Sequence, residues 1–91
     1  MTQEWPLKGV ALVRTAMLDY RITKVRYRDF RRAGYPVMPI WQERLNRDYK
    51  QFNAAIRENI GLVMAMRLRG DFNAWQLEIL KDYDEDDSWI V

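Results

Sequence analysis

Residues 39–69 decide the fold of this chain: PIWQERLNRDYKQFNAAIRENIGLVMAMRLR. Apolar side chains recur along this stretch every three or four residues, at Trp41, Leu45, Tyr49, Phe52, Ile56, Ile60 and Val63. That spacing is typical of one apolar face on an α-helix. The sequence therefore predicts a long central helix around which the rest of the chain packs.

An unbroken helix over residues 39–69 would be about 46 Å long. A compact domain of 91 residues is usually narrower than that. We therefore expect either a partner that covers the excess length or a break, with Gly61 as the weak point because glycine destabilises a helix interior. The residues after Gly61 are apolar all round, which predicts that the helix becomes fully buried there.

A helix is predicted on each side of this central one. The first begins near Leu7, after Pro6, and ends where Ala33-Gly34-Tyr35-Pro36 supplies a glycine for a left-handed cap. Its apolar face is formed by Val10, Val13, Met17 and Tyr20. Because β-branched and aromatic residues gather near Ile22, the helix either continues to Arg32 with a kink there, which we favour, or gives way to a turn and a new element over residues 20–27.

The third helix follows Arg69-Gly70-Asp71, which we interpret as a basic last turn, a glycine C-cap and an aspartate N-cap. Together these patterns predict an all-α fold: a small three-helix domain with helices at about 7–33, 39–69 and 71–82. We expect a single helical domain over residues 1–81 and a flexible acidic C-terminal tail with an apolar tip over residues 82–91.

The composition argues against most enzyme classes. Cysteine and histidine are both absent, so the chain has no disulfide, no thiolate nucleophile, no ordinary zinc site and no histidine general base. No phosphate-binding loop and no metal-ligand cluster stand out, and we expect no cofactor. The start of the sequence has no basic region followed by an apolar run, and no stretch approaches ~18 apolar residues. The sequence thus predicts a soluble, cytoplasmic, non-enzymatic protein that does not bind membranes.

Charge is distributed unevenly along the chain. The formal net charge is +2, but residues 8–50 carry a local charge of +7 and residues 51–91 a local charge of −4. Aromatic residues lie between the cations of residues 20–35, which is the composition of a surface for nucleic acid or an acidic partner. The alternative is a solvated face whose aromatic side chains point into the core. The candidate contacts are Arg21, Lys24, Arg26, Arg28, Arg31, Arg32, Arg44 and Arg47.

Part of this stretch, Thr23 to Val37, resembles the end of a recognition helix and the entry to the wing in winged helix-turn-helix DNA-binding domains. The resemblance rests on DFRRAGYPV at residues 29–37 and covers about fifteen of the 91 residues. It implies that Arg26, Arg28, Arg31 and Arg32 contact DNA. In that family a β-hairpin follows the recognition helix, whereas here a long helical pattern follows.

The stretch DYDEDDSWIV at residues 82–91 joins acidic residues to an apolar tip. It is similar in character to the acidic, apolar-tipped tails of bacterial single-stranded-DNA-binding proteins, which makes it a candidate docking motif. The alternatives are that the tip folds back onto the helices, that the acids pair with the basic half of the chain, or that the segment is disordered. The residues expected to dock are Asp86, Asp87, Trp89, Ile90 and Val91.

The function predicted from these features is the binding of another protein. Size and composition suggest a small regulatory protein, an inhibitor or adaptor of the kind bacteriophages encode, acting on a nucleic-acid-processing partner. The alternative is direct DNA or RNA binding through the basic helix 21–32. A third possibility is a homodimer in which the 41–63 face pairs two copies.

Overall fold

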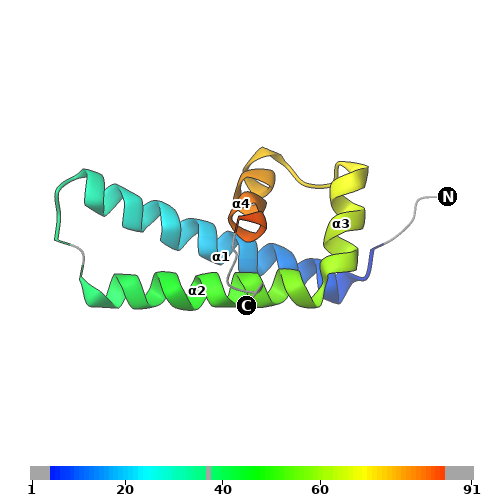
Figure 1. Cartoon of the computed structure of the whole chain (residues 1–91), viewed down its shortest axis with the longest axis horizontal. Coiled ribbons are helices and arrows are strands. Elements are labelled where there is room, and N and C mark those ends of the chain that lie inside the picture. The colour runs from blue at the N-terminus through cyan, green and yellow to red at the C-terminus, as the bar shows by residue number, and fades with distance from the viewer. Residues whose placement is uncertain (1–4, 37, 86–91) are drawn as a thin grey trace.

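The computed structural model describes residues 5–36 and 38–85, and within these ranges the chain forms helices and no strand. The helices are α1 (Leu7–Arg32), α2 (Pro39–Glu58), α3 (Ile60–Arg69) and α4 (Ala74–Asp84). The prediction of an all-α fold is confirmed, but this part of the chain holds four helices and not three (Figure 1). None of the four has both the length and the apolar character needed to cross a membrane.

The helices α1 and α2 form a hairpin along the long axis of the molecule (Figure 1). Gly34 adopts the left-handed conformation with φ 78°, and the Tyr35 N–H donates to the Phe30 carbonyl at 3.1 Å, as expected for a glycine-terminated helix. Pro39 occupies the first turn of α2, where its missing N–H costs nothing. The predicted end of the first helix and start of the second are confirmed, and α1 continues through Ile22 without a break. A helix follows this connection, as its sequence pattern predicted, and not the hairpin of a winged domain.

Residues 39–69 form two helices: the break expected from the length of this stretch occurs, but at Asn59 and not at Gly61. Asn59 leaves the helical conformation, with φ −120° and ψ 29°. Its side-chain amide donates to the Ala55 carbonyl at 2.9 Å and its backbone N–H to the Ile56 carbonyl at 3.2 Å. These bonds satisfy carbonyls that the end of α2 leaves unpaired. The chain then turns steeply into α3 (Figure 1), so the excess length predicted for one helix does not arise.

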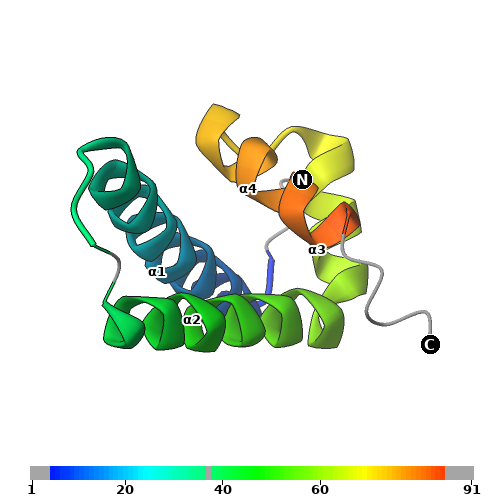
Figure 2. The same ribbon diagram turned by 60° about the vertical axis from the view of Figure 1, so that its left-hand side comes forward.

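The residues after Gly61 are covered on one side only, which contradicts the expectation of full burial. Val63 and Met66 lie in the core, whereas Met64 is 48% exposed and Leu68 is 87% exposed. The reason is that α3 is a short helix at the edge of the molecule, and its inner face alone reaches the other helices (Figure 2).

The turn into α4 is partly as predicted. Gly70 is left-handed, with φ 74°, and ends α3. The N-cap of α4 is Asn73 and not Asp71: Asn73 and Gln76 form a reciprocal capping box. The carboxylate of Asp71 instead accepts a hydrogen bond from the Trp5 indole at 2.5 Å, which ties the start of the chain to this turn.

The helix α4 ends at Asp84, so the first acidic residues after position 81 are helical. Asp82 accepts hydrogen bonds from Tyr20 and Lys24, each at 2.5 Å, and Asp84 pairs with Arg67 at 3.1 Å. These two acids therefore pair with basic side chains of the same chain, which is one of the alternatives given for this segment. Residues 86–91, which include all the predicted docking residues, lie outside the described part of the structure.

The core lies between the α1–α2 hairpin and the two shorter helices, which cover the same side of it (Figure 2). Phe52, Ile56 and Val63 are fully or almost fully buried there. The middle of the apolar face predicted for residues 41–63 is therefore used inside the chain, and this face is not available for pairing two copies. The core residues are Val13, Met17, Tyr20, Phe52, Ile56, Val63, Met66, Phe72, Ile79 and Leu80.

Candidate binding site at the tip of the α1–α2 hairpin

An apolar cavity of about 290 Å³ lies where α1 ends and α2 begins. We call it the tip pocket. Five of its six lining side chains are aromatic or proline, and the sixth is a methionine. Such side chains present large contact areas to a partner at a low cost in conformational entropy. The lining residues are Tyr27, Phe30, Tyr35, Pro36, Met38 and Trp41.

The connection between the helices builds this pocket. Gly34 and the two prolines at positions 36 and 39 reverse the chain within a few residues, which brings the last turns of α1 next to the first turn of α2. The Phe30 ring then lies 5.2 Å from the Trp41 ring and 6.4 Å from the Tyr35 ring, centroid to centroid. These contacts brace the walls, yet Tyr35 remains 64% exposed and accessible to a partner.

Two arginines stand at the rim of the tip pocket. The Arg44 guanidinium lies 5.0 Å from the centre of the Trp41 ring, and that of Arg31 lies 5.9 Å from the centre of the Tyr27 ring. Both distances are within the range of cation–π attraction. The rim therefore combines positive charge with aromatic surface, and arginine, tyrosine and tryptophan are the residues that most often dominate binding energy at interfaces.

A second hollow, of about 430 Å³, adjoins the tip pocket and shares Tyr27 with it. We call it the basic groove, because four of its lining residues are cationic. Lys24 is neutralised by Asp82, and Arg28 lies 3.8 Å from Asp29. Arg32 has no ion-pair partner among the described residues, so the groove keeps a positive balance. The groove is lined by Tyr20, Lys24, Tyr27, Arg28, Arg31, Arg32 and Leu45.

The cations predicted from the sequence do not form one surface. Arg28, Arg31 and Arg32 come together in the basic groove, whereas Arg44 lies against the Trp41 ring of the tip pocket. Arg21 is instead used for packing, since its guanidinium lies 5.0 Å from the centre of the Trp75 ring on α4.

Arg47 lies away from the basic groove, beside Asp19 and Ile22 of α1, and Arg26 follows Ile22 by about one turn on the same stripe of α1. The set of eight predicted cations is thus divided between two faces of the hairpin and the contact with α4.

Tyr20 joins α1 to α4 beneath the basic groove. Burial of its ring, followed by the hydrogen bond to the Asp82 carboxylate, raises the pKa of the Tyr20 phenol well above its usual range. The phenol therefore stays protonated and continues to donate to Asp82 above pH 10, where an ordinary tyrosine ionises. Lys24 donates to the same carboxylate oxygen, and this arrangement holds one wall of the groove in place.

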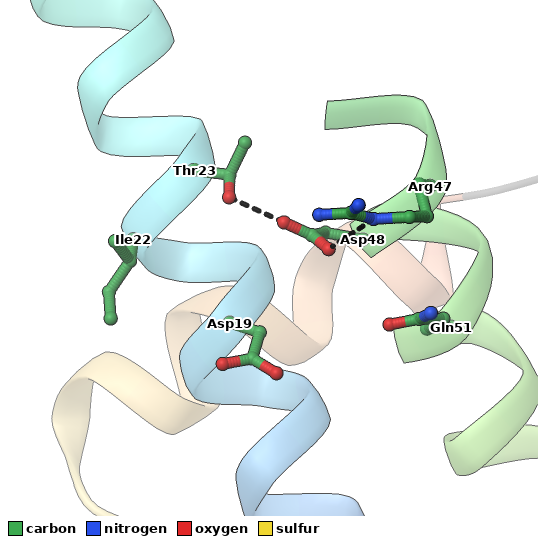
Figure 3. Close-up of a pocket in the computed structure, with 6 residues that line it drawn as sticks. All are labelled: Asp19, Ile22, Thr23, Arg47, Asp48 and Gln51. Atoms are coloured by element: carbon green, nitrogen blue, oxygen red, sulfur yellow. Dashed lines mark hydrogen bonds and ion pairs between the residues drawn. The ribbon is translucent and has the colours of Figure 1, made fainter. Parts of the chain in front are cut away.

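On the other face of the hairpin, a polar hollow of about 380 Å³ lies between α1 and α2 (Figure 3). The Thr23 hydroxyl donates to Asp48 at 2.5 Å, and the Arg47 side chain lies 3.4 Å from the same carboxylate (Figure 3). Asp48 is buried, and its burial was not predicted from the sequence. Its position three residues after Leu45 and four before Phe52, on the apolar stripe, was the signal for burial.

Sequence reasoning also missed the tip pocket. Trp41 was assigned to the apolar face of the central helix, whereas it lines the cavity at the end of the hairpin together with Met38. The available signal was the spacing: aromatic residues occur within five residues on both sides of a short turn that holds glycine and two prolines. Such a turn brings its flanking residues together.

Among residues 5–36 and 38–85, no group of acidic side chains is placed so that it could hold a metal ion. Comparison of the chain with protein-family models, with characterised proteins and with solved structures finds no match.

Proposed function

We propose that this chain is a non-enzymatic binding protein, an inhibitor or adaptor, that engages another protein through the tip pocket. The observation that carries the proposal is the concave apolar cavity with two arginines at its rim. A bulky apolar side chain of a partner would fill the cavity, and acidic groups beside that side chain would meet Arg31 and Arg44. A nucleic-acid-processing partner fits the basic groove as well, because the groove would face the phosphates or acidic surfaces of such a complex.

Photocrosslinking from inside the site tests this function. Tyr35 is replaced by the crosslinking amino acid p-benzoylphenylalanine in the cells that produce the protein, and the same replacement at Leu77 of α4 serves as the control. The two positions are comparable, since both side chains are exposed, at 64% and 42%. We expect a discrete crosslinked protein from position 35 and none from position 77.

The crosslinked protein is then purified and titrated with the unmodified chain. Replacement of Tyr35 by alanine should weaken binding about tenfold or more, because truncation of a hot-spot tyrosine costs about 2 kcal/mol or more and ~1.4 kcal/mol is tenfold in the dissociation constant. The proposal is contradicted if position 35 yields no crosslink, or if positions 35 and 77 yield the same set of products.

Direct nucleic-acid binding is the second candidate, and the basic groove is the observation that favours it. Three arginines and the partly exposed Tyr27 line this hollow, which combines phosphate neutralisation with a surface for base stacking. Anisotropy of labelled single-stranded and duplex DNA, at ~50 and ~200 mM salt, measures it. Tight, salt-sensitive binding that is lost in the double variant Arg28→Glu, Arg31→Glu would favour this function over protein recognition.

A further inference from the structure

The hairpin has a second face, which is turned away from α3 and α4 and lies outside the tip pocket. On α1 this face carries the stripe Leu12, Thr15, Asp19 and Ile22, and on α2 it carries Arg47, Gln51, Ala54 and Glu58. Leu12 is 51% exposed and Ile22 is 42% exposed. We call these eight residues the back face.

Two hollows form one continuous depression along the back face, because both are lined by Asp19 and Gln51. The hollow near the start of α1 is partly apolar, because its lining includes Leu12, Ala16, Ala54 and Ala55. The other is the polar hollow shown in Figure 3, with Ile22 at its edge and Arg47 across from it. Small residues in the middle and larger apolar residues at the two ends would let another helical surface approach closely.

The back face is complementary to itself. Leu12 and Ile22 are ten residues apart, or about 15 Å along α1, and the midpoint between them is at Met17. Arg47 and Glu58 are eleven residues apart, or about 16 Å along α2, and their midpoint is near Phe52.

These two midpoints lie within about one turn of each other along the hairpin. Tyr20, one turn from Met17, stacks on Phe52 with ring centroids 4.9 Å apart, and Ala16 shares a hollow with Ala54. One axis across the hairpin between these two levels brings the members of both pairs to within about a turn of each other.

From this geometry we propose that the back face is an interface with a second copy of the chain, in an antiparallel arrangement with two-fold symmetry. The axis lies in the plane of the interface, between the two copies, and runs across both helices between the levels of Met17 and Phe52. It places Leu12 against Ile22 of the second copy, and Arg47 against Glu58 of the second copy. Each contact occurs twice, as in any isologous interface.

Charge supports this pairing. The Arg47 side chain is 64% exposed, and its contact with Asp48, at 3.4 Å, leaves most of the guanidinium accessible. Glu58 is exposed and has no ion-pair partner within the described residues. The same axis brings the Thr15 hydroxyl to the Asp19 carboxylate of the second copy. Lys8 and Arg26 would meet as like charges at the two outer ends, where solvent screens them.

A charge swap tests the arrangement. The mass of the full chain in solution is measured by sedimentation equilibrium at increasing concentration, and we expect a monomer–dimer equilibrium. Glu58→Arg or Arg47→Glu alone should raise the dissociation constant roughly tenfold or more, because each change creates two like-charge contacts per dimer. The double variant Arg47→Glu, Glu58→Arg restores both pairs and should return the constant to within about threefold of the wild type.

Glu78→Arg is the matched control, because it makes the same change at an exposed acid on α4 and should leave the dimer unchanged. Circular dichroism confirms that each variant is folded. A strict monomer at about 1 mM would overturn the proposal. So would single variants that dimerise like the wild type, or a double variant that behaves like the single ones.

A second measurement does not depend on charge. The chain contains no cysteine, so introduced thiols are the only ones present. The axis places Gln51 next to Ala54 of the second copy. A mixture of Gln51→Cys and Ala54→Cys chains, oxidised mildly, should therefore form the mixed disulfide faster than either symmetric one. Equal rates for all three products would contradict the antiparallel axis. Because the tip pocket stays open in this dimer, neither outcome bears on the proposed protein-binding function.

Discussion

The hydrogen bond between Thr23 and Asp48 is expected to fix how α1 and α2 lie against each other. It joins the two helices at 2.5 Å within the hairpin, and both residues are buried. Three variants probe it: Thr23→Val, Asp48→Leu and the double variant. Valine keeps the shape of threonine but removes the donor, and leucine removes the carboxylate while keeping a side chain of similar size.

The expected magnitudes follow from what each change leaves behind. Thr23→Val takes a donor from a buried carboxylate and should cost about 2 kcal/mol of unfolding free energy, since bonds to charged groups contribute ~1.5–3 kcal/mol. Asp48→Leu strands the Thr23 hydroxyl without its acceptor and should cost about 1–2 kcal/mol. In the double variant neither group is left unsatisfied, so the loss should be smaller than the sum of the single losses by about 1–2 kcal/mol.

Urea unfolding followed by circular dichroism measures these values as midpoint shifts at a constant m-value. For a chain of this size a loss of 1 kcal/mol lowers the melting temperature by roughly 4–8 °C, which gives a second readout. The reasoning is refuted if the two single losses add in the double variant, because the side chains would then act independently.

The remaining predictions concern the α1–α4 contact and two glycines. Because the pKa of the Tyr20 phenol is raised in the folded chain, only the unfolded chain loses this proton just above pH 10. The free energy of unfolding should therefore fall as pH rises beyond 10, by up to about 1.4 kcal/mol per pH unit. Urea unfolding measures this fall, which should be smaller for Tyr20→Phe. Gly61→Ala should stabilise the chain by about 0.5–1 kcal/mol, because Gly61 is helical and open space surrounds its Cβ position, whereas Gly70→Ala should destabilise it by about 1 kcal/mol, because Gly70 is left-handed; thermal melts compare the two.

Local signals in the sequence were sufficient to predict the helical regions and the helix ends that glycine or proline sets. Pro6, Gly34, Pro39 and Gly70 act through their own backbone conformation or their missing N–H, so their effect does not depend on distant residues. The apolar face of α1 was predictable for a similar reason, because helical periodicity alone aligns Val13 with Met17 and Tyr20.

The break at Asn59 was not predictable from local signals, because glycine is the poorer helix former and pointed to Gly61. What decides the position is where α3 must leave α2 so that Val63 and Met66 reach the core, and that is a property of the packed molecule. Asn59 then stabilises the break by hydrogen bonds to α2 that become useful only once the helix has ended.

The candidate site shows the same division. The sequence by itself determined an all-α chain, the helix ends at glycine and proline, and an excess of cations and aromatic rings around residues 20–47, because periodicity, backbone preference and charge are properties of single residues and their neighbours. Only the tertiary structure decided which of these residues act together. In the folded chain Arg21 and Lys24 contact α4, and Arg28, Arg31 and Arg32 line one groove. The packing of Phe30 against Trp41 forms the tip pocket. These choices depend on how helices distant in sequence cover one another, since a side chain that becomes buried or paired is no longer available to a partner.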